Sequence, residues 1–309
     1  MKRSDIAILF AGQGSQKTGM GKDLYQHYEA ARIIFDHPGI DPQIKNMCFE
    51  GPKEKLDDTR YAQSAIFLFS MAMAEVLSTH DIVGQMTAGL SLGEYSALTY
   101  AKAWSISDAM DIINHRSIVM SEALKNQDTG MSAVLGLDLV TIRDICKEAS
   151  TYGICEIANI NCPGQIVISG HKKALSYVKE ACKKHQAQRV IDLGVSGAFH
   201  CCLLEEAASS FKAFLDTMVI KQPVIPVISN RTGKPHTNDI SSLLVQQMTS
   251  TVLFEDSIRW MIKQGVKCFI EIGPIPTLNG FVRKIAPDIE TVSVYDVVSV
   301  DKLLAMMEE

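Results

Sequence analysis

Residues 88–95, Ala-Gly-Leu-Ser-Leu-Gly-Glu-Tyr, join an expected buried strand over 83–88 to an expected helix over 94–100. Their centre, Gly89-Leu90-Ser91-Leu92-Gly93, matches the pattern G-x-S-x-G, in which small residues on both sides of a serine permit a sharp turn. A strand-to-helix turn of this kind presents the serine hydroxyl at the end of a sheet. The stretch therefore predicts an α/β fold with a nucleophilic Ser91, although the pattern alone is common by chance.

Apolar strand-like runs and helical periodicity alternate on both sides of this turn, which indicates an α/β core with parallel strands. Before the turn, the sequence predicts a strand over 6–10 and a buried helix over 62–78. After it, a helix is expected over 107–124, with Ser105 or Ser107 as its cap. The later expected elements are a helix over 203–218, a strand over 226–230, helices over 240–249 and 254–264, a strand over 267–272 and a helix over 301–307.

A different rhythm occupies residues 128–196. It predicts, in order, a strand over 131–137, a helix over 140–150, strands over 154–160 and 165–170, a helix over 172–185 and a strand over 188–195. This β-α-β-β-α-β order is typical of ferredoxin-like domains. We therefore expect a large α/β-hydrolase-like domain with a mostly parallel sheet, formed by residues 1–127 and 197–309, and an inserted ferredoxin-like domain formed by residues 128–196.

Composition and charge disfavour several classes of protein. The 309 residues carry a net charge of −5 without a basic stripe, so no nucleic-acid partner is expected. No run approaches the ~18 uninterrupted apolar residues of a membrane span, and the apolar run over 6–11 is too short for a signal peptide. The eight cysteines form no C-x-x-C pair, which predicts free thiols in a reducing cytoplasm and no metal site. We expect a monomer.

A nucleophilic serine needs a base, and His200 is the strongest candidate. It ends the small and apolar segment 195–199 just before an expected helix, although a purely structural histidine fits there too. In α/β-hydrolases the triad histidine stands near the end of the chain, whereas 109 residues follow His200, so an ordinary hydrolase fits poorly. His115 lies in a helix beside Arg116. The remaining histidines lie in polar or turn-like segments and are expected to be solvated: His27, His37, His80, His171, His185 and His236.

Arg116 lies on the apolar face of the expected helix over 107–124. That face is formed by residues at spacings of three and four: Ala109, Ile112, Ile113, Val119, Met120 and Ala123. An inward guanidinium is costly unless an anion meets it. One reading is an internal salt bridge. The other is a bidentate clamp for a substrate carboxylate, to which the planar arrangement of arginine donors is suited.

The segment Phe10-Ala11-Gly12-Gln13-Gly14-Ser15-Gln16 follows the first expected strand. Glycines on either side of Gln13 let the backbone approach a ligand closely. The amide of Gln13 could then donate to an oxyanion together with the amide of Leu92, the residue after the nucleophile. The alternative is a simple tight turn. A phosphate-binding G-x-G-x-x-G is not completed, because residue 17 is Lys17.

Taken together, these segments resemble the malonyl-CoA:acyl-carrier-protein transacylases over nearly the whole chain. The motifs that carry the resemblance are Phe10 to Gln16, Gly89-Leu90-Ser91-Leu92-Gly93-Glu94-Tyr95, Arg116 with Met120, Asn161-Cys162-Pro163-Gly164-Gln165-Ile166-Val167-Ile168-Ser169-Gly170, Gly197-Ala198-Phe199-His200 and Glu271-Ile272-Gly273-Pro274. The combination is specific, whereas each motif alone is not.

The resemblance implies a ping-pong reaction in which Ser91 takes the malonyl group from malonyl-CoA and passes it to the phosphopantetheine thiol of acyl carrier protein. It implies His200 as the base, with the backbone carbonyl of Gln247 orienting the imidazole, and Arg116 as the partner of the malonyl carboxylate. The amides of Gln13 and Leu92 would form the oxyanion hole. Two further residues would line the acyl site: Met120 and Phe199, the latter matching a malonyl-type rather than a methylmalonyl-type signature. No cofactor is implied.

The sequence departs from the family pattern at a few positions, none of which carries a proposed role in the reaction. Leu90 stands where many relatives have histidine, Ala11 replaces a commoner proline, and Ser117 follows Arg116 where glycine is frequent. Segment 273–278 lacks the usual Gly-Lys pair. Three alternatives remain open: a trans-acting acyltransferase of a polyketide pathway, an acyl hydrolase of such a pathway, and a non-catalytic protein that binds the carrier.

Overall fold

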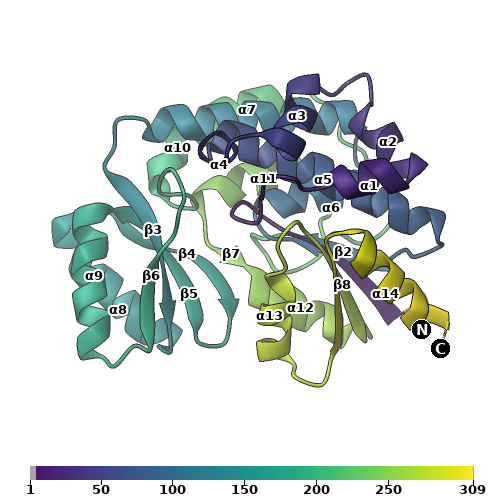
Figure 1. Ribbon diagram of the computed structural model, residues 1–309. Helices are drawn as coiled ribbons and strands as arrows, with labels where there is room; N and C mark the ends of the chain where they lie inside the picture. Colours follow the sequence, from purple (N-terminus) through teal and green to yellow (C-terminus); the bar gives the residue numbers. More distant parts are fainter. Residues whose placement is uncertain (1–4, 309) are drawn as a thin grey trace.

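A parallel sheet, sheet A, forms the core of the larger part of the molecule (Figure 1). The computed structural model describes residues 5–308. The strands of sheet A are β1 (Ile6–Phe10), β2 (Met86–Gly89), β8 (Cys268–Ile272) and β9 (Glu290–Val294), in the order β2-β1-β8-β9 with every pairing parallel. All residues of β1, β2 and β8 are buried, as expected for a parallel sheet covered by helices. The predicted α/β fold is therefore confirmed.

Helix α5 (Thr59–Thr79) is the central helix above sheet A. It contacts five other helices: α2 (Glu29–Phe35), α3 (Pro42–Glu50), α4 (Lys53–Leu56), α6 (Leu92–Tyr100) and α7 (Ile106–Leu124). By length and composition α5 could cross a membrane, but 83% of its most apolar window is buried inside the fold. Burial on all sides explains why it is apolar all round, which is the usual property of a core helix.

Helix α7 begins where the sequence predicts. Ser105 and Asp108 form a capping box at its start, which confirms Ser105 as the cap. The other helices are α1 (Lys22–His27), α10 (Glu205–Leu215), α11 (Ile240–Thr249), α12 (Phe254–Lys263), α13 (Leu278–Ile285), α14 (Val297–Glu308) and the short 3-10 helices η2 (Ser150–Tyr152) and η3 (Cys202–Leu204).

A second sheet, sheet B, lies beside this part of the molecule (Figure 1). Its strands are β3 (Thr129–Leu135), β4 (Cys155–Cys162), β5 (Gln165–His171), β6 (Arg189–Asp192) and β7 (Val252–Leu253), in the order β6-β3-β5-β4-β7. The first four pair in an antiparallel manner, and α8 (Leu139–Ala149) packs against α9 (Lys172–Lys184). The ferredoxin-like classification and the domain boundaries stay predictions, and residues 1–4 and 309 of the predicted large domain lie outside the described residues.

The structure differs from the sequence-based expectations in several places: helices α1 to α4 and α13 were not expected, and three strands also differ. The expected strand over 226–230 forms only isolated bridges, Thr87 with Val227 and Ile228 with Pro235. Pro226 lacks an amide hydrogen, which limits pairing there. Strand β9 was not expected; its five residues contain only two apolar side chains, Val292 and Val294, which is a short signal. Strand β7 was also not expected, since two residues give no periodic signal.

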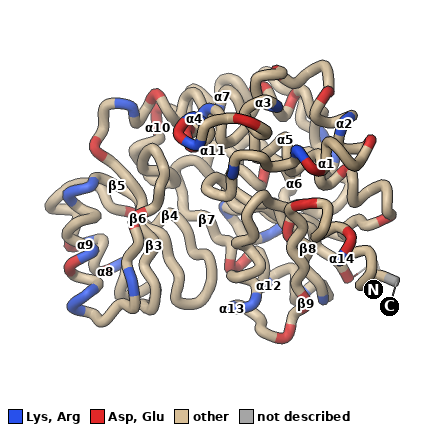
Figure 2. The backbone as a smooth tube through the Cα atoms, in the orientation of Figure 1, with Lys and Arg blue, Asp and Glu red and all other residues tan. Residues whose placement is uncertain are grey.

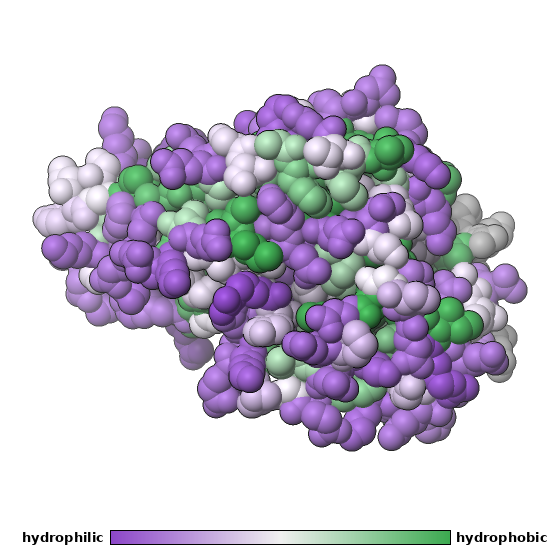
Figure 3. Space-filling model, turned by 90° about the horizontal axis from the view of Figure 1, so that it is seen from above, coloured by the Kyte–Doolittle hydropathy of each residue, from purple (hydrophilic) through white to green (hydrophobic). Residues whose placement is uncertain are grey.

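Charges and apolar residues are interspersed over the surface. Figure 2 shows Lys and Arg together with Asp and Glu on the outer helices, whereas the strands of both sheets are largely uncharged. On the face seen from above, hydrophobic residues lie in separate small groups among hydrophilic ones (Figure 3).

Candidate active site

The turn between β2 and α6 forces Ser91 into an unusual backbone conformation. Its φ is 54° and its ψ is −104°, outside the regions that non-glycine residues prefer. A Cβ atom on Gly89 would lie 2.0 Å from the carbonyl carbon of Gly93, and one on Gly93 would lie 2.1 Å from the carbonyl oxygen of Phe10. Only glycine fits at these positions, which is the physical reason for the G-x-S-x-G pattern.

Asn230 holds this turn from the opposite side. Its Oδ1 accepts a hydrogen bond from the Ser91 amide at 2.7 Å, and its Nδ2 donates to the Gly89 carbonyl at 2.7 Å. Asn230 is fully buried. The sequence analysis did not identify it, because an asparagine 139 positions from its partner in the chain gives no local signal.

His200 lies between Ser91 and Gln247. Its Nε2 is 2.8 Å from Ser91 Oγ, and its Nδ1 is 2.7 Å from the backbone carbonyl oxygen of Gln247. A carbonyl can only accept, so Nδ1 carries the hydrogen and Nε2 is free to accept the serine proton. Like Ser91, His200 has a positive φ, 59°. Of the five described non-glycine residues with positive φ, two are therefore the serine and the histidine that face each other.

Burial keeps the imidazole neutral. It lowers the pKa of His200 to about 4; the nearby positive charge of Arg116 adds to the shift, and the hydrogen bond to the Gln247 carbonyl opposes it. A histidine with this pKa is unprotonated at neutral pH and is ready to take a proton. The arrangement can therefore deprotonate Ser91 without an acidic third member.

Arg116 is buried, with 1% of its surface exposed, and its guanidinium points at Ser91. Nη2 donates to Ser91 Oγ at 3.2 Å and to the side-chain Oε1 of Gln247 at 3.0 Å, while Nη1 donates to Gln63 Oε1 at 2.7 Å. Among the described residues, no acid forms an ion pair with Arg116, and its Nε has no hydrogen-bond partner. The internal salt bridge considered above is therefore not formed.

Two glutamines connect Arg116 to the loop after β1. Gln63, fully buried on α5, donates from Nε2 to Gln13 Oε1 at 3.3 Å and to Met120 Sδ at 3.9 Å. Gln13 in turn donates from Nε2 to Thr59 Oγ1 at 2.9 Å. The structure thus places Gln13 and Met120 near Arg116, each through Gln63. The sequence analysis missed Gln63, since a glutamine in an apolar helix is only a weak signal.

The two amides expected to bind an oxyanion are available. Within residues 5–308, the amides of Gln13 and Leu92 donate to no other backbone or side-chain group. Leu92 begins α6, where amides have no carbonyl one turn earlier to bind. Phe199 is buried in the same apolar core as Leu92 and Met120 and directly precedes His200.

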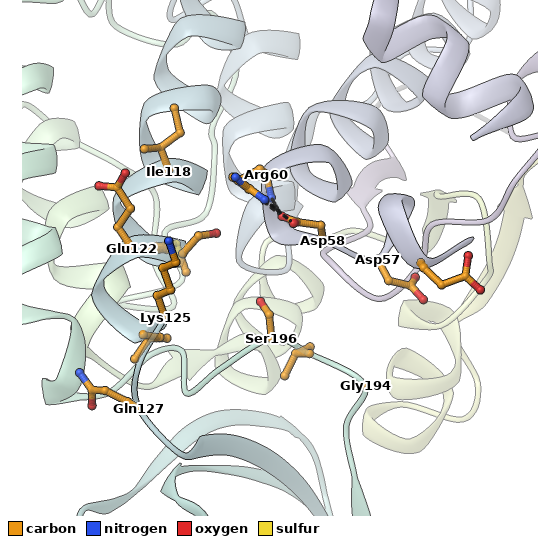
Figure 4. Close-up of a pocket in the computed structure, with 14 residues that line it drawn as sticks. Asp57, Asp58, Arg60, Ile118, Glu122, Lys125, Gln127, Gly194 and Ser196 are labelled. Atoms are coloured by element: carbon orange, nitrogen blue, oxygen red, sulfur yellow. Dashed lines mark hydrogen bonds and ion pairs between the residues drawn. The ribbon is translucent and has the colours of Figure 1, made fainter. Parts of the chain in front are cut away.

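A cavity of about 900 Å³ opens beside this cluster (Figure 4). Met120 and Ser196 belong to its wall, and Ser196 Oγ is 2.6 Å from Thr59 Oγ1. The rim carries charges of both signs, among them the pair Asp58 and Arg60 drawn in Figure 4. Neither Ser91 nor His200 lines the cavity; its link to the cluster is Met120, whose sulfur accepts from Gln63.

One expectation about the histidines is wrong. His236, expected to be solvated, is buried, and its Nε2 lies 2.6 Å from Oε1 of the fully buried Glu94. The short polar segment around His236 gave no sign of this, because the partner lies 142 residues away in the chain. The eight cysteines are all free, and the described residues contain no group of acidic, histidine or cysteine side chains that could hold a metal ion.

Comparison with known proteins agrees with this geometry. The family model described as "Acyl transferase domain" matches residues 8–302. A relative from Bacillus subtilis (strain 168), named malonyl CoA-acyl carrier protein transacylase, is 40% identical over 99% of this chain and 98% of its own length. The crystal structure of a malonyl CoA-acyl carrier protein transacylase from Clostridium perfringens is 37% identical, covers 99% of this chain and 98% of that one, and superimposes with a TM-score of 0.94.

A second similar structure contains a partner. It is a malonyl-transacylase in complex with a type II polyketide acyl-carrier protein; it is 32% identical, covers 98% of this chain and 100% of that one, and has a TM-score of 0.93. These matches extend over nearly the whole chain and include the turn at Ser91. The chain therefore belongs to the acyl transferase family.

Proposed function

We propose that this acyltransferase moves the malonyl group of malonyl-CoA to the phosphopantetheine thiol of acyl carrier protein in fatty acid synthesis. The observation that carries the proposal is a buried guanidinium with a free donor, Arg116 Nε, beside a serine that is hydrogen-bonded to a neutral histidine. The names of the similar proteins from Bacillus subtilis and Clostridium perfringens support the same reaction.

In the first half-reaction, His200 Nε2 takes the proton of Ser91 as Oγ attacks the thioester carbonyl of malonyl-CoA. The negative charge that forms on the carbonyl oxygen is bound by the free amides of Gln13 and Leu92. The carbon–sulfur bond then breaks, and His200 returns its proton to the departing coenzyme A thiolate. The product is a malonyl ester of Ser91. The hydrogen bond from His200 Nδ1 to Gln247 stabilises the imidazolium while it exists.

In the second half-reaction, the phosphopantetheine thiol of the carrier protein takes the place of coenzyme A. His200 accepts the thiol proton, the sulfur attacks the ester carbonyl, and the bond to Ser91 Oγ breaks. The proton then passes from His200 back to Ser91. The same amides bind the second oxyanion, and no cofactor or metal takes part in this scheme.

Arg116 selects the acyl group by its charge. A guanidinium has five N–H donors, and three of them are used within the free site, so Nε–H and one hydrogen on Nη1 remain for a carboxylate. Because Nη2 already contacts Ser91 Oγ, a short acyl chain with a terminal carboxylate reaches the guanidinium once it is bound to that oxygen. Met120 and Phe199 supply apolar walls nearby.

Mass spectrometry of the intact protein after mixing with equal amounts of malonyl-CoA, acetyl-CoA and methylmalonyl-CoA tests the proposal. We expect a malonyl adduct that is absent from Ser91→Ala. Arg116→Ala should lose about 10²-fold in malonyl loading while acetyl loading persists, because a charged hydrogen-bond pair is removed. A wild-type preference for malonyl in Arg116→Ala would show that this residue is not the clamp.

A polyketide carrier is the second candidate acceptor, because a similar structure holds a malonyl-transacylase with such a carrier. Transfer rates from the malonyl enzyme to a fatty-acid carrier and to a polyketide carrier distinguish the two pathways. Release of free malonate without a carrier would instead indicate an acyl hydrolase. Failure to form any adduct would leave a carrier-binding protein without catalysis.

We also propose a cytoplasmic, monomeric enzyme. Eight free thiols support a reducing compartment. Light scattering after size exclusion tests the monomer, for which one chain should give a mass near 34.0 kDa.

A further inference from the structure

Gln247 contacts three residues of the proposed reaction centre, Ser91, His200 and Arg116. Its backbone carbonyl accepts from His200, its side-chain Oε1 accepts from Arg116, and its Nε2 donates to the Ser91 carbonyl at 3.0 Å. The same Nε2 also donates to Oε2 of Glu94 at 2.6 Å. The residue is buried, with 1% of its surface exposed, so each of these contacts is shielded from water.

The direction of the Gln247 amide matters for Arg116. An amide has an accepting oxygen and a donating nitrogen of almost the same shape. In the observed direction the oxygen faces the guanidinium. In the reversed direction two donors, the Gln247 amide nitrogen and Arg116 Nη2, would face each other. The guanidinium would then turn away or lose its hydrogen bond to Gln247.

Two acceptors favour the observed direction: the Ser91 carbonyl and the carboxylate of Glu94, which makes the shorter contact. The carboxylate oxygens of Glu94 accept but do not donate, so only the amide nitrogen of Gln247 can bind to Oε2. The other oxygen, Oε1, is held by His236 Nε2, and both side chains are completely buried. Glu94 therefore cannot turn away to solvent. The Gln247 side chain lies between the Glu94 carboxylate and the Arg116 guanidinium, so the carboxylate does not occupy the guanidinium donors that remain free.

We propose that Glu94 is a positioning residue for acyl selection: held by His236, it fixes the Gln247 amide so that the Arg116 guanidinium presents its free donors to the carboxylate of the acyl group. The inference rests on the proposed role of Arg116. It adds two residues, Glu94 and His236, that touch no substrate and act through Gln247.

The test compares Glu94→Ala with Glu94→Gln in the competition between malonyl-CoA and acetyl-CoA. Alanine removes the carboxylate acceptor and leaves only the Ser91 carbonyl to hold Nε2, so we expect the malonyl-to-acetyl loading ratio to fall about tenfold or more, while acetyl loading stays within about threefold. Glutamine keeps an acceptor oxygen, and we expect it to restore the ratio to within about threefold of the wild type. A wild-type ratio in Glu94→Ala, or equal loss of both loading reactions, overturns the proposal.

The experiment also includes Glu271→Gln as a matched control and His236→Ala as a second variant. Glu271 is also a buried glutamate, but none of its hydrogen bonds involves a residue of the site, so Glu271→Gln should leave the ratio unchanged. If Glu94→Ala does not fold, His236→Ala decides: a ratio lowered about threefold or more supports the proposal, and an unchanged ratio contradicts it. Arg116→Ala separates the two ideas, since loss of preference there but not in Glu94→Ala removes this inference alone.

Discussion

Two connections at the carboxyl end of sheet A lead from a strand to the start of a helix. The first amides of a helix have no backbone partner and attract negative charge, and the two connections use these amides in opposite ways. After β8, the buried Glu271 turns back onto the start of α13, where Oε1 accepts from the amides of Thr277 at 2.6 Å and Leu278 at 2.7 Å. Its Oε2 accepts from the Asn279 amide at 3.0 Å. The chain thus supplies its own anion to the amides at this helix start.

After β2, the corresponding position is left open. The Ser91 amide is bound by Asn230, but the amide of Leu92 at the start of α6 has no partner among residues 5–308. In the reaction proposed above, the negative charge that meets this amide is the one that forms on the oxygen of the substrate. One connection therefore satisfies its helix start with its own carboxylate, and the other leaves the Leu92 amide free, which the proposed mechanism uses for the oxyanion.

Removing the nucleophile is the largest test of this contrast. In Ser91→Ala, covalent malonyl loading should disappear, a loss of more than about 10³-fold in turnover, because no group remains to form the ester. The free energy of unfolding should change by less than about 0.5 kcal/mol, since the backbone turn and the Asn230 bonds persist. Intact-mass analysis and urea unfolding measure the two effects. A large loss of stability would mean that this connection is also structural.

Glu271→Gln tests the other connection, the one between β8 and α13. An amide cannot accept all of the hydrogen bonds that the buried carboxylate receives, so we expect a loss of about 2–4 kcal/mol in the free energy of unfolding. Malonyl loading per folded molecule should stay close to the wild type. Calorimetry together with loading kinetics at low temperature checks both parts. A selective loss of malonyl loading would contradict the separation of roles.

Asn230→Ala tests the turn between β2 and α6, which contains Ser91. Loss of the bonds to the Ser91 amide and the Gly89 carbonyl should slow malonyl loading about tenfold, because the strained serine is no longer held in place. Asn279→Ala is the matched control at the other turn, where the amide nitrogen donates to the Val292 carbonyl at 2.8 Å. There we expect reduced stability with an unchanged loading rate, measured by stopped-flow mixing with malonyl-CoA.

The smallest expected effect is that of mild acid. Because burial lowers the pKa of His200 to about 4, the base stays unprotonated as the pH falls from 7.5 to 5.5, and kcat/KM for malonyl-CoA should change less than about twofold. A histidine with the usual pKa near 6.5 would lose most of its activity over this range. Replacing Arg116 with glutamine removes a positive charge and should move the acid limb of acetyl loading to higher pH. An acid limb near pH 6.5 in the wild type would contradict the buried, neutral base.

Much of this site could be predicted from the sequence, because its central parts are local patterns. The glycines around Ser91 and the arginine on an apolar helix face each carry a physical requirement that is visible within a few residues. Asn230 and Gln63 lack such a signal. Each is an ordinary polar residue whose meaning depends on a partner far away in the chain, as with the 53 positions between Gln63 and Arg116.

The error at His236 has the same origin. Its neighbours Lys234 and Pro235 suggest a solvated turn, whereas the fold buries the imidazole against Glu94. The short strand β7 was missed for a related reason, since pairing with β4 at only Val252 and Leu253 is decided by tertiary contacts and not by local preference.

That short strand makes the molecule hard to divide. Thr251 Oγ1 donates to the Ile157 carbonyl of sheet B at 2.6 Å, and the Leu253 amide donates to the Asn230 carbonyl at 2.8 Å. Gln247, which supports the histidine, lies only four positions before Thr251. Excising residues 128–196, or opening the chain near 250 by circular permutation, should therefore disturb the residues that hold Ser91 and His200. New termini belong at exposed loops elsewhere.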